Sequence, residues 1–303
     1  MGLVKLEVVL KEKAIVGEGP SWDAENGLLN WVDILGQKVH SFHPASGRND
    51  TLQFDQYVGT VVSRDCGGLV VALQDGIYAV DEHGQLMSRL AAPEAHLPRN
   101  RFNDGKCDPA GRLWAGTMSM DQSPRAGALY RLDPDLSIHR MLTEVTISNG
   151  LGWSPDGSVM YFIDTPTMKV VAYEYELLTG SLGKVVTEIV IPEPGAPDGM
   201  TVDEEGMLWI AHWGGSRVSR WNPYKGECLE EVQLPVQLCT SCVFGGPELN
   251  ELYITTARGR QTELELKDQP HAGNLFRLQM NVKGQPSYKF KEINNHLGGN
   301  GNE

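Results

Sequence analysis

A hairpin pattern of about 45 residues recurs along the chain and constrains its fold more than any other feature. Each copy begins with a polar residue, usually followed by glycine, and continues as a short apolar strand, a turn and a second apolar strand. Two clear copies read NGLGWSPDGSVMYFIDT from residue 149 and DGMTVDEEGMLWIAHW from residue 198. The second strands of six such copies lie about 39 to 48 residues apart, centred on Trp31, Val70, Trp114, Tyr161, Trp209 and Tyr253. Repeats of this period indicate a ring or an array of similar supersecondary units.

Two further strands complete each unit. A third strand follows each hairpin, as in GALYRLDP at 127–134, and a more polar fourth strand such as KVVTEIVI at 184–191 comes after it. Side chains alternate as half-buried strands require, and helical periodicity never extends beyond a turn or two. We therefore predict an all-β, six-bladed β-propeller with four antiparallel strands per blade and no helix. A sandwich or barrel of similar hairpins is the alternative, and six copies in phase favour the propeller.

The last unit, roughly 241–293, lacks a strand at one edge. The early strand LEVVL at 6–10 is predicted to pair with that unit and close the ring, which would remove the open sheet edges. We therefore expect one propeller domain over residues 1–303, ordered over about 1–296, with a flexible tail at 297–303.

Charge and cysteine usage exclude several classes of protein. The formal net charge is -13, and no Lys/Arg cluster could neutralise phosphates, which argues against nucleic-acid binding. No apolar run approaches the roughly 20 residues of a membrane span, and charged residues interrupt the N-terminus where a signal peptide needs an apolar core. The five cysteines are an odd number without a disulfide framework, so we expect a cytoplasmic protein. No large apolar stripe suggests a partner surface, so we expect a monomer.

The polar residue that opens each copy is expected to lie at one mouth of the central channel, because the first strand of each propeller blade lines that channel. The six positions are Glu18, Thr60, Asn103, Asn149, Asp198 and Ser241. An Asn-Gly or Asp-Gly pair also forms turns without any functional role. The recurrence of polar residues at the same blade position favours a shared site over six independent turns.

Three of these residues suit a metal ion. Glu18, Asn149 and Asp198 offer hard oxygen donors with a summed charge of about −2, which matches one divalent cation. Oxygen donors suit Ca²⁺, Mg²⁺ or Mn²⁺ and do not exclude Zn²⁺ or Fe²⁺. Three protein ligands also leave positions for water and substrate, as catalytic metals require. The Cys239-Thr-Ser-Cys242 spacing, in contrast, has no second pair to complete a zinc site, so these cysteines are interpreted as buried thiols.

At these residues the chain resembles the regucalcin, gluconolactonase and luciferin-regenerating-enzyme family, and within it the bacterial sugar lactonases. The resemblance runs from GEGPSWD at 17–23 to HAGNLFRL at 271–278. It includes the motifs RFNDGKCDPAGRLWAGTM, ISNGLGWSPDG, PDGMTVDEEGMLW, TSCVFGG and TTARG. It implies a six-bladed propeller with one divalent metal in the channel mouth, Ca²⁺ before Zn²⁺, Mn²⁺, Mg²⁺ or Fe²⁺.

The resemblance also implies roles for individual residues. Glu18, Asn149 and Asp198 would bind the metal, and Arg101 and Asn103 would hold oxygen atoms of the substrate. Asp198 would also act as general base. The loop SMDQSPRAG departs from the family pattern, but Asp121 keeps an acidic side chain at the matching place. His212, in the segment HWGG, either reaches the substrate or is a structural histidine.

The function implied is a metal-dependent sugar lactonase, a hydrolase that opens the ring ester of an aldonolactone. One alternative is a regucalcin-like calcium-binding regulatory protein. Another is a metal-dependent hydrolase of a different ester, a phosphotriester or an acyl lactone. A calcium buffer has no need for Arg101 and Asn103 beside its metal. The last class should show an apolar rim, of which the sequence offers only a small wall of Trp213 and Met120. Both points favour the sugar lactonase.

Overall fold

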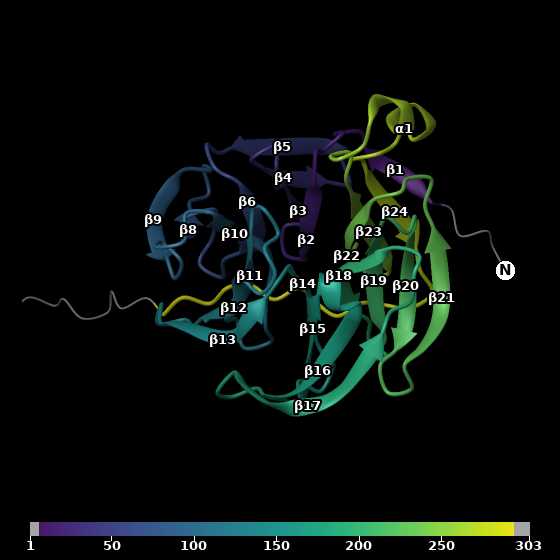
Figure 1. Cartoon of the computed structure of the whole chain (residues 1–303). Coiled ribbons are helices and arrows are strands. Elements are labelled where there is room, and N and C mark those ends of the chain that lie inside the picture. The colour runs from purple at the N-terminus through teal and green to yellow at the C-terminus, as the bar shows by residue number, and fades with distance from the viewer. Residues whose placement is uncertain (1–5, 294–303) are drawn as a thin grey trace, which may run out of the picture.

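The computed structural model describes residues 6–293, whose strands form six four-stranded antiparallel sheets arranged as a ring (Figure 1). The first three blades comprise β2 (Gly17–Asp23), β3 (Leu28–Asp33), β4 (Lys38–His43) and β5 (Arg48–Gln53); β6 (Val58–Ser63), β7 (Leu69–Leu73), β8 (Ile77–Val80) and β9 (Leu86–Ala91); and β10 (Asn100–Cys107), β11 (Leu113–Ser119), β12 (Gly127–Leu132) and β13 (Ile138–Val145). Within each blade, strands pair in chain order from the channel outward.

The next two blades follow the same order. They comprise β14 (Ser148–Trp153), β15 (Val159–Asp164), β16 (Lys169–Glu176) and β17 (Ser181–Val190); and β18 (Ala196–Val202), β19 (Leu208–Trp213), β20 (Arg217–Asn222) and β21 (Glu227–Gln233). The sixth blade contains β22 (Cys239–Gly245), β23 (Glu251–Thr256), β24 (Leu275–Gln279) and, as its outermost strand, β1 (Glu7–Leu10). The predicted six-bladed propeller, with four antiparallel strands per blade, is confirmed.

Strand β1 closes the ring as predicted. It pairs antiparallel with β24, with Glu7 opposite Arg277 and Val8 opposite Phe276. The first and last parts of the chain therefore share one sheet, and unfolding of either end must break the same ladder. The predicted tail at 297–303 lies outside the described residues.

The apolar core lies between neighbouring blades, and the burial of the strands decreases from the channel outward. Strand β6 is buried throughout, whereas β9 is mostly exposed. The centres of the second strands carry the largest fully buried side chains, among them Trp31, Trp114 and Trp209. These large side chains fill the widening space between adjacent twisted sheets, which explains why the repeat places an aromatic residue there so often.

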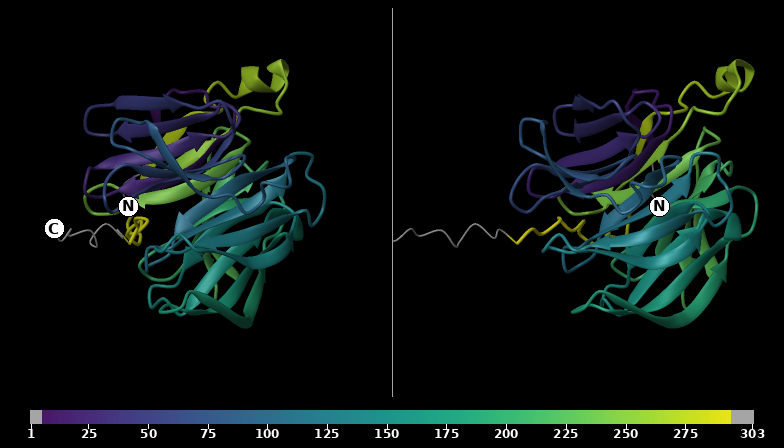
Figure 2. Two further views of the ribbon diagram at one scale, coloured as in Figure 1. Left: turned by 90° about the vertical axis from the view of Figure 1, so that its left-hand side faces the viewer. Right: turned by 60° about the vertical axis from the view of Figure 1, so that its left-hand side comes forward.

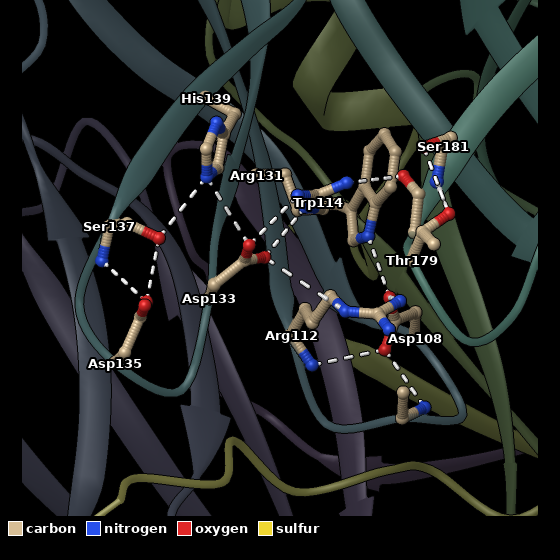
Figure 3. Close-up of polar contacts among 12 residues, drawn as sticks. Asp108, Arg112, Trp114, Arg131, Asp133, Asp135, Ser137, His139, Thr179 and Ser181 are labelled. Atoms are coloured by element: carbon tan, nitrogen blue, oxygen red, sulfur yellow. Dashed lines mark hydrogen bonds and ion pairs between the residues drawn. The ribbon is translucent and has the colours of Figure 1, made fainter.

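Two of the buried tryptophans are held by the same ionic arrangement. Asp108 begins the turn between β10 and β11, and its Oδ2 accepts hydrogen bonds from Trp114 Nε1 at 3.0 Å and Arg112 Nη1 at 3.1 Å (Figure 3). In the fifth blade, Asp203 Oδ2 accepts from Trp209 Nε1 at the same distance. The Asp-x₅-Trp spacing therefore fixes the indole N–H while the ring fills the core.

The prediction that the chain contains no helix is wrong in one place. A short helix, α1 (Glu263–Asp268), follows β23, and a 3₁₀ turn, η1 (Thr165–Thr167), follows β15. Helix α1 buries no residue, so it leaves no apolar periodicity in the sequence. Its visible signal is the capping box of Thr262 and Glu265. Within residues 6–293, neither helix is long and apolar enough to cross a membrane.

A strap of residues 281–293 crosses one end of the channel. It follows β24 and runs across the middle of the ring, in yellow in Figure 1, on the side of the molecule away from α1 (Figure 2). Hydrogen bonds join it to all six blades, at Trp22, Ser63, Gly111, Trp153, Val202 and Leu249. The strap therefore covers the end of the channel at which the innermost strands finish. It does not cover the end at which these strands begin.

Candidate active site

The six innermost strands bring the predicted polar residues together at a common level. Each of these strands contacts its two neighbours around the axis. The predicted residues lie within these strands rather than before them, because the strands begin further upstream than the sequence indicated. At each position the pairing with the second strand shifts register, as between Glu18 and Ser21 or Asn149 and Leu151. Such bulges redirect side chains and are frequent at functional sites.

A cavity of about 280 Å³ opens at this level of the channel. Five predicted residues line it: Glu18, Arg101, Asn103, Asn149 and Asp198. Thr60 and Ser241 occupy the equivalent places on β6 and β22 but do not line the cavity. The polar lining thus comes from the first, third, fourth and fifth blades, which carry the larger polar side chains at this level.

A chain of hydrogen bonds orients the amides of the site. Arg101 Nη1 donates to Asn103 Oδ1 at 2.8 Å, and Asn103 Nδ2 donates to Asn149 Oδ1 at 3.1 Å. Asn149 Nδ2 donates in turn to Thr165 Oγ1 at 2.8 Å, whose hydroxyl donates to the Pro197 carbonyl. Each amide therefore has one possible orientation. Thr165, which lies in η1 and was not predicted from the sequence, is the last side chain of this hydrogen-bond chain.

The two carboxylates of the site are buried near one another. Burial, and then the charge of Asp104, raise the pKa of Glu18 to about 8, against a smaller opposing effect of its hydrogen bond from the Gly19 amide. Burial, followed by the charges of Glu18 and Asp104, raises the pKa of Asp198 well above its ordinary value. Buried like charges without a cation favour protonation, so this arrangement is electrostatically suited to a positive ligand.

A second charged pair lies in the channel and was not predicted. Asp104 is buried and Lys106 is half-buried on β10, and Lys106 Nζ donates to the Met200 carbonyl at 2.7 Å. Burial raises the pKa of Asp104 while Lys106 opposes that rise, and burial lowers the pKa of Lys106 while Asp104 opposes it. The two residues therefore balance each other's charge. They belong to the same RFNDGKC segment that carries Arg101 and Asn103.

The residues fit a divalent cation. Among residues 6–293, no three His, Cys, Asp or Glu side chains gather as a metal site. The donor set here is instead two carboxylates, Glu18 and Asp198, and the Asn149 amide. Asn149 Oδ1 receives one hydrogen bond and keeps a lone pair, while burial and the charge of Glu18 raise the pKa of Asp198. Oxygen-only donors with a summed charge of about −2 suit hard divalent ions.

Two predicted substrate contacts lie outside the cavity. Asp121 accepts hydrogen bonds from Ser119 and Ser123 and pairs with Arg99 at 3.1 Å, with its side chain 46% exposed. The hydrogen bonds from these two serines lower the pKa of Asp121 to about 2. These contacts turn the carboxylate back onto its own loop, and the neighbours Met120 and Gln122 line the cavity instead.

His212 is a buried structural residue in this arrangement. Its Nε2 lies 2.6 Å from Ser219 Oγ on the neighbouring strand β20, and the ring is fully buried. Burial lowers the pKa of His212 to about 3, so the ring is neutral at physiological pH. The strand places the side chain between sheets rather than toward the mouth. Trp213, the next residue, lines the cavity.

The rest of the cavity wall is more apolar than the sequence indicated. Its remaining lining residues are Val16, Ile34, Leu35, Tyr57, Met118, Met120, Gln122, Ile147, Thr165, Trp213 and Arg260. Most come from loops of different blades, so their convergence has no local signature in the sequence. The expected absence of an apolar rim is therefore corrected. The polar residues occupy the floor, and the apolar residues surround it.

Comparisons with known proteins agree with this arrangement. Residues 16–258 match the family described as SMP-30/Gluconolactonase/LRE-like region. Regucalcin of Danio rerio is 42% identical over 294 residues, covering 96% of this chain and 99% of that protein. The 6-deoxy-6-sulfogluconolactonase of Pseudomonas putida is 39% identical over 282 residues, covering 92% and 96% respectively. A crystal structure of a calcium-binding protein, regucalcin, from Agrobacterium tumefaciens superposes with a TM-score of 0.90 at 28% identity, covering 95% of this chain and 98% of that chain.

Proposed function

Because the chain belongs to the SMP-30/gluconolactonase/LRE-like family, we propose that it is a divalent-metal-dependent sugar lactonase. Its reaction is hydrolysis of the ring ester of an aldonolactone to the aldonic acid. The observation that carries this proposal is the joining of two groups in one cavity, the oxygen donors Glu18, Asn149 and Asp198 and the substrate-holding pair Arg101 and Asn103. The sugar-lactonase name of the Pseudomonas putida relative supports the same substrate class.

Glu18, Asn149 and Asp198 would hold the metal ion, with Ca²⁺ as the first candidate and Zn²⁺, Mn²⁺, Mg²⁺ or Fe²⁺ as the others. The calcium-binding regucalcin among the similar structures supports this order. When bound, a divalent cation polarises the ester carbonyl and lowers the pKa of a water molecule. The hydrogen-bond chain from Arg101 to Thr165 keeps the Asn149 oxygen directed at this place.

The residues of the chain then carry the proton and hold the substrate. Asp198 accepts a proton from the attacking water as the water oxygen bonds to the carbonyl carbon. The bond between that carbon and the ring oxygen breaks, and Asp198 returns the proton to the departing ring oxygen. Arg101 and Asn103 bind oxygens of the sugar and fix the ester over Asp198. The net change is the addition of one water molecule across the ester bond.

A second candidate function follows from the apolar wall. Residues such as Met118, Met120 and Trp213 would accommodate a less polar ester, an acyl lactone or a phosphotriester. A calcium-binding regulatory role requires the oxygen donors but gives no part to Arg101 or Asn103. The polar floor is common to all three functions, so only a substrate comparison separates them.

The setting of the reaction is also part of the proposal. We propose a cytoplasmic monomer whose partner is a small-molecule sugar lactone and which binds neither nucleic acid nor membrane. The formal net charge of -13 supports the exclusion of nucleic acid.

The test is acid release measured with a pH indicator. Chelator-stripped protein is compared with and without each divalent ion, on glucono-δ-lactone, pentonolactones, an acyl lactone and a phosphotriester, after subtraction of spontaneous hydrolysis. The sugar lactonase predicts metal-dependent acceleration on an aldonolactone. Acceleration on the acyl lactone or phosphotriester alone would assign the second candidate. No acceleration from protein shown to bind metal would favour the regulatory role.

A further inference from the structure

Two loops with unusual backbone conformations meet at the rim of the cavity. Arg260 lies in the loop that follows β23, and Gln122 lies in the loop that joins β11 to β12. Both line the cavity, and both have positive φ angles, 62° and 58°. Residues other than glycine adopt this region uncommonly, and such conformations cluster at ligand sites. Eight other described residues that are not glycine also have positive φ, so the further argument rests on the contact between these two side chains.

Arg260 is held by a neutral partner. With its amide oxygen turned toward the guanidinium, Gln122 accepts hydrogen bonds from both terminal nitrogens of Arg260, at 2.6 and 2.7 Å. Within residues 6–293, no carboxylate lies within ion-pair distance of Arg260. Nearby arginines differ, since Arg99 pairs with Asp121 and Arg125 pairs with Glu144. Gln122 thus fixes the direction of the guanidinium without neutralising its charge.

The charges of the cavity leave Arg260 without a counterpart. This count rests on the proposed function, in which Glu18 and Asp198 balance one divalent ion. Asp104 and Lys106 balance each other in the channel. In the same proposed function Arg101 is already assigned to oxygen atoms of the sugar. Burial, and after it the charge of Arg260, lowers the pKa of Arg101 to about 10, so Arg101 remains charged at neutral pH.

We propose that the cavity takes a sugar lactone carrying a second, negatively charged group, a carboxylate, sulfonate or phosphate, which Arg260 binds at the rim. Gln122 is the positioning residue that presents the guanidinium to this group. An anion there completes the charge balance and forms paired, charge-assisted hydrogen bonds. A neutral aldonolactone contacts the same polar residues of the cavity but offers no negative group to Arg260. It is therefore the poorer substrate.

The test compares pairs of molecules that share a ring and differ in charge. Glucono-lactone is set against glucaro-lactone and 6-phosphogluconolactone for hydrolysis, and gluconate is set against glucarate for binding to the metal-loaded protein by calorimetry. The variants are Arg260→Gln, which removes the charge, and Gln122→Glu, which keeps Arg260 and neutralises it in place. Arg125→Gln is the matched control, because Arg125 also has a positive φ of 61° but lies outside this cavity.

We expect wild type to prefer the anionic member in kcat/KM and in affinity, and both cavity variants to reduce that preference about tenfold. Hydrolysis of the neutral lactone should fall less than that of the anionic lactone in both variants, and Arg125→Gln should behave as wild type. Equal loss on neutral and anionic lactones, or no anionic preference in wild type, would overturn the inference.

The binding arm separates this inference from the proposed function. If no lactone is hydrolysed but glucarate binds more tightly than gluconate and Arg260→Gln abolishes the difference, the lactonase proposal fails and the anion site stands. If lactones are hydrolysed and glucarate shows no Arg260-dependent advantage, the lactonase stands and the anion site fails.

Discussion

At the scale of single residues, the polar groups of the site differ in whether they already have hydrogen-bond partners within the protein. Asn103 and Asn149 each have their amide nitrogens engaged, so their orientation is fixed before any substrate arrives. Arg101, in contrast, donates through Nη1 to the Phe102 carbonyl and to Asn103, and no further hydrogen bond joins its guanidinium to the described part of the chain. Arg101 also lines the cavity. We therefore propose that Arg101 binds the substrate and that the carboxylates of Glu18 and Asp198 bind the metal.

Replacement of Arg101 tests this division. Arg101→Ala should lower kcat/KM on an aldonolactone about 10- to 100-fold, because charge-assisted hydrogen bonds to the substrate are lost. Metal affinity, measured by calorimetry, should change little, and Arg101→Lys should recover part of the loss. A collapse of metal binding in Arg101→Ala would show that Arg101 is structural.

The raised pKa of Glu18 predicts a pH dependence of the metal-free protein. Folded Glu18 holds its proton up to about 8, whereas the unfolded chain releases it near 4.5. Between these values the folded state binds more protons than the unfolded state, so stability falls as pH rises through the window. Urea unfolding of chelator-stripped protein at several pH values should show this fall, and metal affinity should rise over the same range. Glu18→Gln should flatten this part of both profiles; unchanged profiles in that variant would contradict the assignment.

At the scale of elements, the strand pattern was predictable and the loops were not. Each hairpin carries its own signals, an alternation of apolar side chains ended by a turn such as Pro155-Asp156-Gly157, so the six blades could be counted from the sequence. Helix α1 is exposed and lacks an apolar face, so only its capping box marks it. His212 lies next to Trp213 in sequence, yet strand alternation sends only Trp213 to the cavity.

The part of the site that lies on the strands could likewise be predicted from the sequence, whereas the part that lies on loops could not. The polar residues of the innermost strands occupy the same position in each blade. The sequence repeat alone therefore predicted that Glu18, Asn103, Asn149 and Asp198 lie close together. Arg260 and Gln122 come from loops of different blades, and their meeting depends on backbone angles that no local pattern specifies. Repetition therefore reveals the polar floor, while the rim requires the structure.

The strap at 281–293 offers an element-scale prediction. Phe290 is fully buried and packs with Phe102 and Cys107 at the covered end of the channel. Phe290→Ala should lower the free energy of unfolding by about 3–5 kcal/mol, the usual loss for a buried phenylalanine. Ile293→Ala is the matched control, because Ile293 is 59% exposed and should change stability by less than about 0.5 kcal/mol. Equal effects of the two substitutions in denaturant unfolding would show that the strap is not an integral part of the core.

At the scale of the whole molecule, ring closure converts a linear repeat into one enclosed site. The β1–β24 pairing completes the sixth blade with its fourth strand and joins the two ends of the described chain in one sheet. The strap covers one end of the channel, and the polar cavity lies toward the other end. The net charge of -13 keeps the surface acidic while two guanidiniums face the cavity. A small anionic or oxygen-rich molecule therefore finds its positive partners inside the ring rather than on its surface.

The central claim is that Glu18, Asn149 and Asp198 bind the metal ion that makes this chain a lactonase. The most direct measurement is acid release from an aldonolactone by wild type and Asp198→Asn, each stripped with chelator and reconstituted with the activating ion. Wild type should regain its activity on reconstitution. The variant should remain folded, bind the ion more weakly and turn over at least about a hundredfold more slowly even at saturating metal, because it has lost its base. Near-normal hydrolysis by Asp198→Asn, or full activity of stripped wild type, would contradict the account.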